Sequence, residues 1–146
     1  MKSTELKNKA GTISLIILLV LIFFSNIYAQ RTDFLISTVV PAARGYVDIN
    51  LNHEKNYVIK VYVSDLTEVK RLVPSKHSYV VWMITEQTIL KNIGQINSLT
   101  GFFVKKIKES LEIISPFKPI KVFITTEYDS RVRYPSADIV LSTQNI

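Results

Sequence analysis

The sequence predicts an all-β fold, an immunoglobulin-like antiparallel β-sandwich of about seven strands, preceded by an N-terminal signal-peptide helix. Three observations support this prediction. From residue 46 onward, apolar and polar side chains alternate in short runs, which is the pattern of strands with one buried face. Turn residues separate these runs, and the number of runs is that of a sandwich. Near the N-terminus, the stretch 13–24 is apolar at every position except Ser14.

The N-terminal residues have the layout of an export signal. Three lysines against one glutamate precede the apolar run 13–24, which is shorter than the roughly 20 residues of a membrane span but fits a signal-peptide core. Ile27 and Ala29 then place a branched and a small residue just before Gln30. We therefore expect a signal peptide over 1–29, cleavage between Ala29 and Gln30, and a periplasmic or extracellular location. The alternative is an uncleaved signal anchor, because flanking residues extend the run to about the lower limit for a span.

Composition limits the chemistry of the chain. It contains no cysteine, which excludes disulfides, thiolate nucleophiles, cysteine metal ligands and a lipid-carrying cysteine at the cleavage site. The formal net charge is +6, and the basic residues are spread along the chain. The densest basic patch, within 105–108, is followed directly by acidic residues. This mixture favours a solvated face, so we expect no nucleic acid among the partners.

Removal of the signal peptide leaves one domain's worth of chain. We expect a flexible N-terminal segment over 30–40 and a single β-sandwich domain over 41–146. A domain of that size buries roughly two-thirds of its unfolded surface, so its core suffices without disulfides.

The first strands form a hairpin in this prediction. Runs 46–51 and 57–63 alternate apolar and polar side chains, and the loop 52–56 joins them as an antiparallel pair. The charged stretch 65–77 has no usable period and is expected to cross the surface. The run 79–85 is nearly all apolar, as in a central strand that is covered on both faces. Later strands are expected at 89–96, 121–127 and 137–143, with a turn at 97–101 and a loop at 128–136.

The stretch 102–115 is ambiguous. Phe103, Ile107, Leu111 and Ile114 fall at the spacing of an amphipathic helix. However, every neighbouring element is a strand, and the Ile113-Ile114 pair is β-branched. Two short strands are therefore favoured over a helix.

The second half carries short motifs in a defined order. They are YVVW at 79–82, KNIGQ at 91–95, PFKP at 116–119, FITTE at 123–127, YP at 134–135 and VLST at 140–143. This order resembles the C-terminal extracytoplasmic domain of anti-sigma-K factors, in a stand-alone secreted form. The resemblance implies the fold and the compartment, but no sigma-factor binding, because the zinc-containing segment of those factors has no counterpart here. It marks as structural positions Trp82, Asn92, Gly94, Pro116, Phe117, Pro119, Thr125, Glu127 and Pro135.

Signatures of common catalytic sites do not occur in the sequence. It has no G-x-S-x-G elbow, no P-loop and no H-E-x-x-H motif. His53 and His77 are too few for a closed zinc site, which needs four ligands. We therefore expect no catalytic residue, no metal and no cofactor. The enzymatic alternative is a small envelope carbohydrate-active hydrolase that pairs strand-end carboxylates among Glu86, Glu127 and Asp129.

Structural roles are expected for the most conspicuous residues of the second half. Trp82 should pack in the core against the opposite sheet, with an acceptor for its indole N–H. Glu127 should accept hydrogen bonds from backbone N–H groups of the loop that follows it. Pro116 and Pro119 should fix a corner, with Phe117 pointing inward as a plug.

The leading functional prediction is a non-catalytic, exported interaction or sensory domain of the cell envelope. Its partner is expected to be an envelope protein or a glycan, and the oligomeric state is not predicted. Tyr62 and Tyr128 are the best candidates for exposed binding residues, because tyrosine is enriched at binding surfaces. No membrane span is expected after signal cleavage. A third possibility is a signal-anchored accessory subunit that docks on a membrane protein through the edge of the sandwich.

Overall fold

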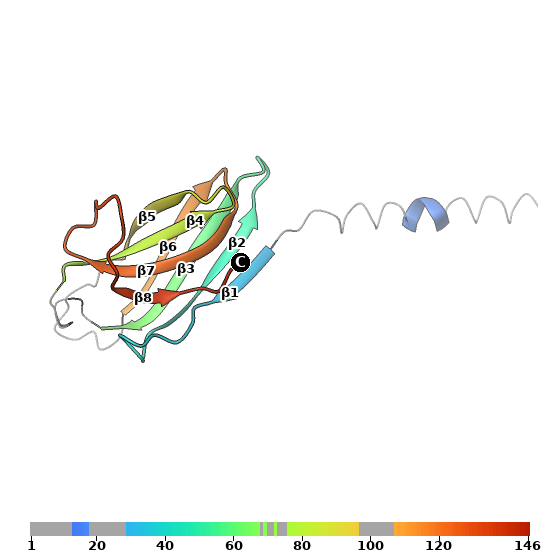
Figure 1. Cartoon of the computed structure of the whole chain (residues 1–146). Helices are drawn as coiled ribbons and strands as arrows, with labels where there is room; N and C mark the ends of the chain where they lie inside the picture. The colour runs from blue at the N-terminus through green and yellow to red at the C-terminus, as the bar shows by residue number, and fades with distance from the viewer. Residues whose placement is uncertain (1–12, 18–28, 68, 70–71, 73–75, 97–106) are drawn as a thin grey trace, which may run out of the picture.

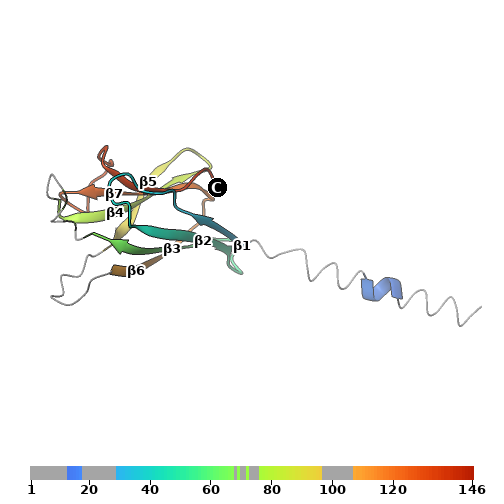
Figure 2. The ribbon, with the colours of Figure 1, turned by 90° about the horizontal axis from the view of Figure 1, so that it is seen from below.

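The computed structural model describes residues 13–17, 29–67, 69, 72, 76–96 and 107–146. Its strands form two four-stranded antiparallel sheets that pack face to face, which confirms the all-β prediction (Figures 1 and 2). Residues 13–17 are helical, and no helix among the described residues is long and apolar enough to cross a membrane. Most of the predicted signal peptide, the turn at 97–101 and residues 102–106 lie outside the described residues.

Each sheet has a simple strand order. The first sheet runs β1-β2-β3-β6, and the second runs β5-β4-β7-β8. The strands of the first sheet are β1 (Ala29–Asp33), β2 (Arg44–Leu51), β3 (Tyr57–Leu66) and β6 (Ile107–Ser115). Those of the second sheet are β4 (Ser78–Thr85), β5 (Leu90–Ile96), β7 (Pro119–Glu127) and β8 (Ile139–Ser142).

The first sheet contains a β2–β3 hairpin. Here β2 and β3 are neighbours, joined by a tight hairpin at the predicted loop. The Asn52 carboxamide oxygen accepts the N–H of Glu54 at 3.0 Å and that of Asn56 at 2.9 Å, and Lys55 takes a positive φ of 60°. A loop closed in this way returns the chain at once along β2, so the two strands pair antiparallel in the same sheet.

Residues 30–33 of the segment predicted to be flexible lie in a strand. This strand is β1, which pairs with β2 from Ala29↔Asn50 to Asp33↔Tyr46. The chain then passes to the second sheet, where the N–H of Leu35 donates to the carbonyl of Ser142 at 2.9 Å. Backbone hydrogen bonds to β2 hold this segment in the sheet. The side chains of 29–33 show no alternation of apolar and polar residues that would predict a strand.

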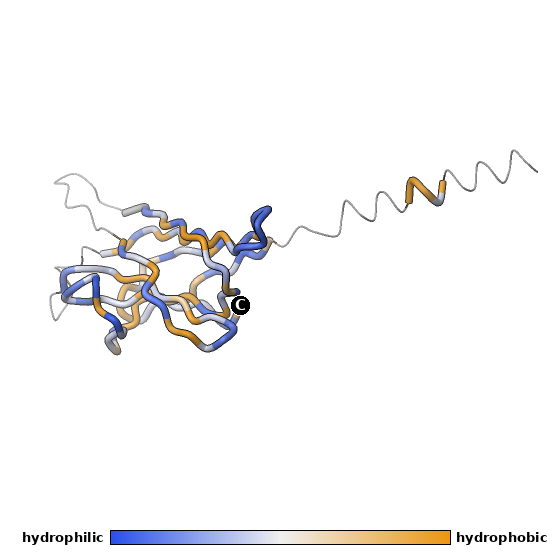
Figure 3. The backbone as a smooth tube through the Cα atoms, turned by 90° about the horizontal axis from the view of Figure 1, so that it is seen from above, coloured by the Kyte–Doolittle hydropathy of each residue, from blue (hydrophilic) through white to orange (hydrophobic). Residues whose placement is uncertain are grey.

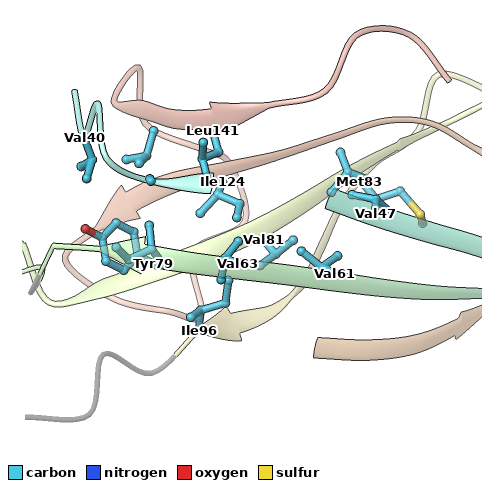
Figure 4. Packing of buried hydrophobic residues seen from close by; sticks show 14 of the residues in the cluster. Val40, Val47, Val61, Val63, Tyr79, Val81, Met83, Ile96, Ile124 and Leu141 are labelled. Atoms are coloured by element: carbon cyan, nitrogen blue, oxygen red, sulfur yellow. The ribbon is translucent and has the colours of Figure 1, made fainter. Parts of the chain in front are cut away.

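The core lies between the two sheets (Figure 4). On β2 and β3 the predicted alternation is confirmed, since Val47, Ile49, Ile59, Val61 and Val63 are all buried. Figure 3 shows the alternation as short hydrophobic and hydrophilic stretches along the strands. The opposite layer comes from β4, β7 and β8, with Tyr79, Val81, Met83, Val122, Ile124, Val140 and Leu141.

The ambiguous stretch is a strand where it is described. β6 pairs with β3 over its whole length, from Tyr57↔Ser115 to Leu66↔Ile107. One irregularity interrupts the register between Ser64 and Leu66, where Asp65 has a φ of 58°. The helical alternative is therefore wrong for 107–115, because the edge of β3 supplies backbone partners that a helix would leave unused.

Candidate functional site

A groove of about 750 Å³ lies on the first sheet. We call it the tyrosine groove, after the two rings in its wall. On β2 and β3 the even-numbered side chains alternate with buried ones, so Arg44, Tyr46, Tyr62 and Ser64 project from the outer face. The full lining is Asp33, Phe34, Arg44, Gly45, Tyr46, Tyr62, Val63, Ser64, Glu109 and Ser110. Its volume falls within the range of small-molecule sites.

The wall of the tyrosine groove is a stacked column. Tyr46 and Tyr62 are directly opposite in the β2–β3 ladder, and their rings stack with centroids 4.7 Å apart and an interplanar angle of 27°. The Arg31 guanidinium carbon lies 3.4 Å from the Tyr46 centroid. Two groups cannot share one face of a ring at these distances, so Arg31 and Tyr62 cover opposite faces of Tyr46. The column therefore runs Arg31, Tyr46, Tyr62.

Polar groups of both signs line the groove beside this column. Asp33, opposite Tyr46, contributes a carboxylate, and the serines at 64 and 110 contribute hydroxyls. Glu109 pairs with the buried Val63, so its side chain lies on the other face of the sheet. The guanidinium of Arg44 donates from Nη1 to the carbonyls of Pro41 at 2.6 Å and Ala43 at 2.7 Å. These backbone bonds hold the guanidinium in place, and it keeps its positive charge, so the lining carries charges of both signs.

A ladder of charges crosses the same outer face in the next row. Arg31 lies 4.0 Å from Asp48, and Lys60 lies 3.1 Å from Glu112. The hydrogen bond and the charge of Glu112 raise the pKa of Lys60. These exposed pairs contribute little stability individually.

Of the two predicted binding candidates, Tyr62 lies in the groove wall and Tyr128 lies elsewhere. Tyr128 is 57% exposed, next to β7, with the Lys76 ammonium 4.1 Å from its ring centroid. Sequence reasoning missed Tyr46. The hairpin register could have identified it, because a loop at 52–56 places residue 46 opposite residue 62.

A second cluster lies on the outer face of the other sheet. Trp82 is fully buried, as predicted, but it packs here with Val80 and Phe123 rather than against the first sheet. The inner face of β4 is taken by its odd-numbered residues, so alternation turns Trp82 outward. Val132, from the loop after β7, packs against the cluster and covers it.

Glu127 links this cluster to the loop that covers it. Its Oε1 accepts the hydroxyl of Thr125 at 2.6 Å and the backbone N–H of Ser136 at 2.8 Å. The Thr125 hydroxyl in turn accepts the indole N–H of Trp82 at 2.8 Å. The predicted role of Glu127 in holding the loop is thus confirmed, with Ser136 as the donor.

Other positions of the motif series have structural roles around the same sheet. The Asn92 carboxamide donates to the carbonyls of Ser130 at 2.9 Å and Val132 at 3.1 Å, which fixes the covering loop. Gly94 has a φ of 142°, and an added Cβ would lie 3.1 Å from the methyl carbons of Leu111. Pro135 is half-buried in the loop.

The corner before β7 is only partly as predicted. Pro119 is buried at the start of β7, and Pro116 is exposed. Phe117 is half-buried rather than a core plug, with the Lys91 ammonium 4.5 Å from its ring centroid. The Ser115 hydroxyl accepts the N–H of Phe117 at 3.1 Å, which keeps the ring near the surface of the corner.

Glu86 and Glu127 lie too far apart to act as a glycosidase pair. Glu127 pairs in register with Ser78, at one end of β4, whereas Glu86 follows the other end. At the rise of a strand, the two acids are about 26 Å apart, beyond the roughly 10 Å limit of glycosidase pairs. Asp129 is bound to Arg131, whose backbone and side-chain hydrogen bonds lower the pKa of the Asp129 carboxyl.

The two histidines lie apart. His53 is exposed in the β2–β3 hairpin, and His77 Nδ1 is 3.0 Å from the carbonyl oxygen of Tyr128. Within the described part of the chain, no group of three or more His, Asp or Glu side chains is placed to hold a metal ion.

Comparison with known protein families, curated proteins and solved structures finds no match.

Proposed function

We propose that this chain is an exported, non-catalytic binding domain of the bacterial cell envelope, and that the tyrosine groove is its binding surface. The observation that carries the proposal is the stacked pair of Tyr46 and Tyr62, which lies among the polar lining residues Asp33, Arg44, Ser64 and Ser110. Aromatic side chains with a polar rim are the usual composition of recognition surfaces. In this proposal the domain is similar to the outer domain of anti-sigma-K factors, without the sigma-binding part.

Binding is favoured over hydrolysis by the position of the acids. Glu86 and Glu127 lie at opposite ends of the second sheet, and the Glu127 carboxylate is committed to Thr125 and Ser136. The groove combines aromatic rings with hydroxyl groups, which are typical of a binding surface.

Export is part of the proposal and fits the start of the fold. Cleavage between Ala29 and Gln30 would leave the pairing of β1 from Gln30↔Ile49 to Asp33↔Tyr46 intact. The mature domain would then keep Arg31, the end of the stacked column. Mass spectrometry of the protein recovered from envelope and medium is the test of export. A chain that begins at Gln30 supports it, whereas an intact N-terminus in the membrane fraction supports the anchored accessory subunit instead.

The binding surface can be tested by site-specific photo-crosslinking in living cells. A photoreactive residue at Ser110 lies in the tyrosine groove, and one at Tyr134, which is 79% exposed, lies on the loop of the other sheet. We expect the Ser110 probe to form an adduct with an envelope component that the Tyr134 probe does not form. Equal adducts from both positions, or none from Ser110, would contradict the proposal.

A further inference from the structure

We propose that the outer edge of β6 binds β6 of a second copy of this chain, antiparallel and with the two Ser110 residues opposite each other on a two-fold axis. The first sheets of the two copies then form one continuous sheet. This inference goes beyond the proposed function and does not depend on the ligand of the tyrosine groove. Three features support it: a long open strand edge, charges arranged symmetrically about Ser110, and half-buried apolar side chains beside the edge.

β6 is the longest of the strands that end the two sheets (Figure 2). β1 has five residues, and β8 has four and accepts the N–H of Leu35 at its last residue. β5 carries an extra residue, Ile93, where its register with β4 shifts. β6 has nine residues, and its register with β3 is uninterrupted from Lys108 to Ser115. A long, regular end strand is a template for pairing with another chain.

The hydrogen-bond pattern shows which backbone groups of β6 face the open edge. The N–H of Asn52 donates to the carbonyl of Asn56 at 2.9 Å, so the even-numbered residues of β3 bond β2 and the odd-numbered ones bond β6. Odd-numbered residues of β3 pair with odd-numbered residues of β6. The even-numbered residues of β6, among them Ser110 and Glu112, therefore point their N–H and C=O groups away from β3. Within the described ranges, no backbone hydrogen bond reaches these outward groups.

Charge favours one register of the two paired strands. With Ser110 on the axis, Lys108 of each copy is directly opposite Glu112 of the other, which gives two opposite-charge pairs. An axis at Glu109 or Glu112 would place two carboxylates opposite each other, and an axis at Leu111 would pair no opposite charges. Charged residues commonly protect an end strand from pairing. Here their opposite signs on either side of Ser110 select a second copy as the partner.

The ladder of charges on the outer face of the first sheet supports the same register. Arg31, Asp48, Lys60 and Glu112 lie opposite one another in successive strands. Their signs alternate across the sheet, and the series ends with the carboxylate of Glu112 on the open strand. Lys108 of a second copy adds the next positive charge to this series.

Apolar side chains beside the open edge are incompletely covered. Leu111 and Ile113 of β6 are half-buried, whereas Val61 and Ile59, their partners on β3, are completely buried. The apolar core is therefore partly exposed along β6. A second copy would extend the sheet past these side chains, and the burial of their apolar surface favours association.

Pairing at Ser110 also joins the two tyrosine grooves. Ser110 lines the groove and is opposite Tyr62 in the β3–β6 ladder. In the paired sheet one row runs through Tyr46, Tyr62 and Ser110 and then through the same residues of the second copy in reverse order. The dimer therefore presents two grooves side by side on one face, and a ligand that reaches both gains affinity from the second contact.

The oligomeric state tests this inference directly. The protein recovered after export would be studied by sedimentation equilibrium from about 1 to about 200 µM, because an interface formed by one pair of strands is small and weak. We expect a reversible equilibrium between monomer and dimer. A protein that stays monomeric over the whole range would overturn the inference.

Amide exchange followed by NMR identifies the edge that pairs. The outward N–H groups of Ser110 and Glu112 should exchange about tenfold or more slowly at the highest concentration than at the lowest. The N–H of Leu111, which bonds β3, should change much less. Dimerisation without slower exchange at Ser110 and Glu112 would mean that another surface pairs, which also overturns the inference.

Charge variants test the register. Glu112→Lys and Lys108→Glu each place like charges opposite each other and should weaken the dimer about tenfold or more. The double variant restores two opposite-charge pairs and should regain the dimer. Glu54→Lys, the same charge change at an exposed position of the β2–β3 hairpin, is the matched control and should dimerise as the unaltered protein does. Circular dichroism verifies the fold of each variant. Single variants that dimerise normally, or a double variant that does not recover, would refute the proposed pairing.

The Ser110 photoprobe separates this inference from the proposed function. An adduct of twice the mass of the chain contains a second copy, whereas an adduct of any other mass contains a partner of the groove. A dimer adduct alone supports the pairing of β6 and counts against the groove as a binding surface for another envelope component. An adduct with another component, formed by a protein that stays monomeric, has the opposite meaning.

Discussion

The indole N–H of Trp82 donates a 2.8 Å hydrogen bond to the hydroxyl of Thr125, and both side chains are completely buried. Thr125 lies diagonally across from Trp82 in the β4–β7 ladder. The Thr125 hydroxyl donates in turn to the Glu127 carboxylate. The same carboxylate accepts the backbone N–H of Ser136 and so holds the covering loop. The side chains of Trp82, Thr125 and Glu127 and the backbone N–H of Ser136 thus form one continuous series of hydrogen bonds beneath the loop.

Thr125→Val should lower the free energy of unfolding by about 1–3 kcal/mol. The change leaves the indole N–H without an acceptor and removes one donor from the Glu127 carboxylate, and unsatisfied buried groups carry costs of that size. Chemical denaturation followed by circular dichroism measures it. Trp82→Phe completes a double-mutant cycle, and we expect its cost to be smaller in the Thr125→Val background. Fully additive costs would show that the bond does not couple the two residues.

Asn92→Ala should release the covering loop without unfolding the sandwich. The Asn92 carboxamide supplies hydrogen bonds to two loop carbonyls, and the side chain itself is exposed. Amide exchange over 128–136 should accelerate, and trypsin should cleave faster after the exposed Arg131 and Arg133. The control is Gln95→Ala, at an exposed position of the same strand, which should leave both rates unchanged. Equal rates in the two variants would contradict the role of Asn92.

β2 and β3 were predictable from sequence because each presents one apolar face. Alternation identified both strands and most of their inward side chains, but β2 begins at Arg44 rather than at 46, β3 ends at Leu66 rather than at 63, and Leu51 is exposed. β4 illustrates the limit of this reasoning. Its residues are apolar on both faces, so the sequence predicts two covered faces but not which layer covers each. For this reason the sequence did not predict that the loop after β7, rather than the first sheet, covers Trp82.

β1 and the tyrosine groove could not be predicted from the pattern of side chains along the sequence. β1 is an edge strand without an apolar face, and its order comes from backbone pairing with β2. Tyr62 could be singled out as exposed, but its partner Tyr46 became visible only through the hairpin register. Glu127 was predictable because a carboxylate at the end of a strand has loop N–H groups within reach.

Gly45→Ala should destabilise the first sheet. A Cβ at this position would overlap the carbonyl oxygen of Tyr62 and approach Phe34 Cδ2 at 3.1 Å. The oxygen belongs to the central β2–β3 ladder and cannot move without breaking it, so we expect a loss of about 1–3 kcal/mol or more. Thermal and chemical unfolding measure the loss. Ser110→Ala, an exposed substitution in the same groove, is the control and should change stability little.

Stability should fall between pH 10 and pH 12 because of Tyr79. Burial raises the pKa of Tyr79 to about 12, and its hydroxyl donates to the carbonyl of Thr67 at 2.7 Å. The unfolded chain releases this proton near its ordinary pKa of about 10, so it binds fewer protons than the folded chain above that pH. By linkage the free energy of unfolding then decreases by up to about 2–3 kcal/mol and levels off above pH 12. Tyr79→Phe removes the titrating group and keeps the ring. The difference between the two proteins, followed by Trp82 fluorescence during denaturation, isolates Tyr79 from the lysines that titrate nearby, and a constant difference across this range would refute the prediction.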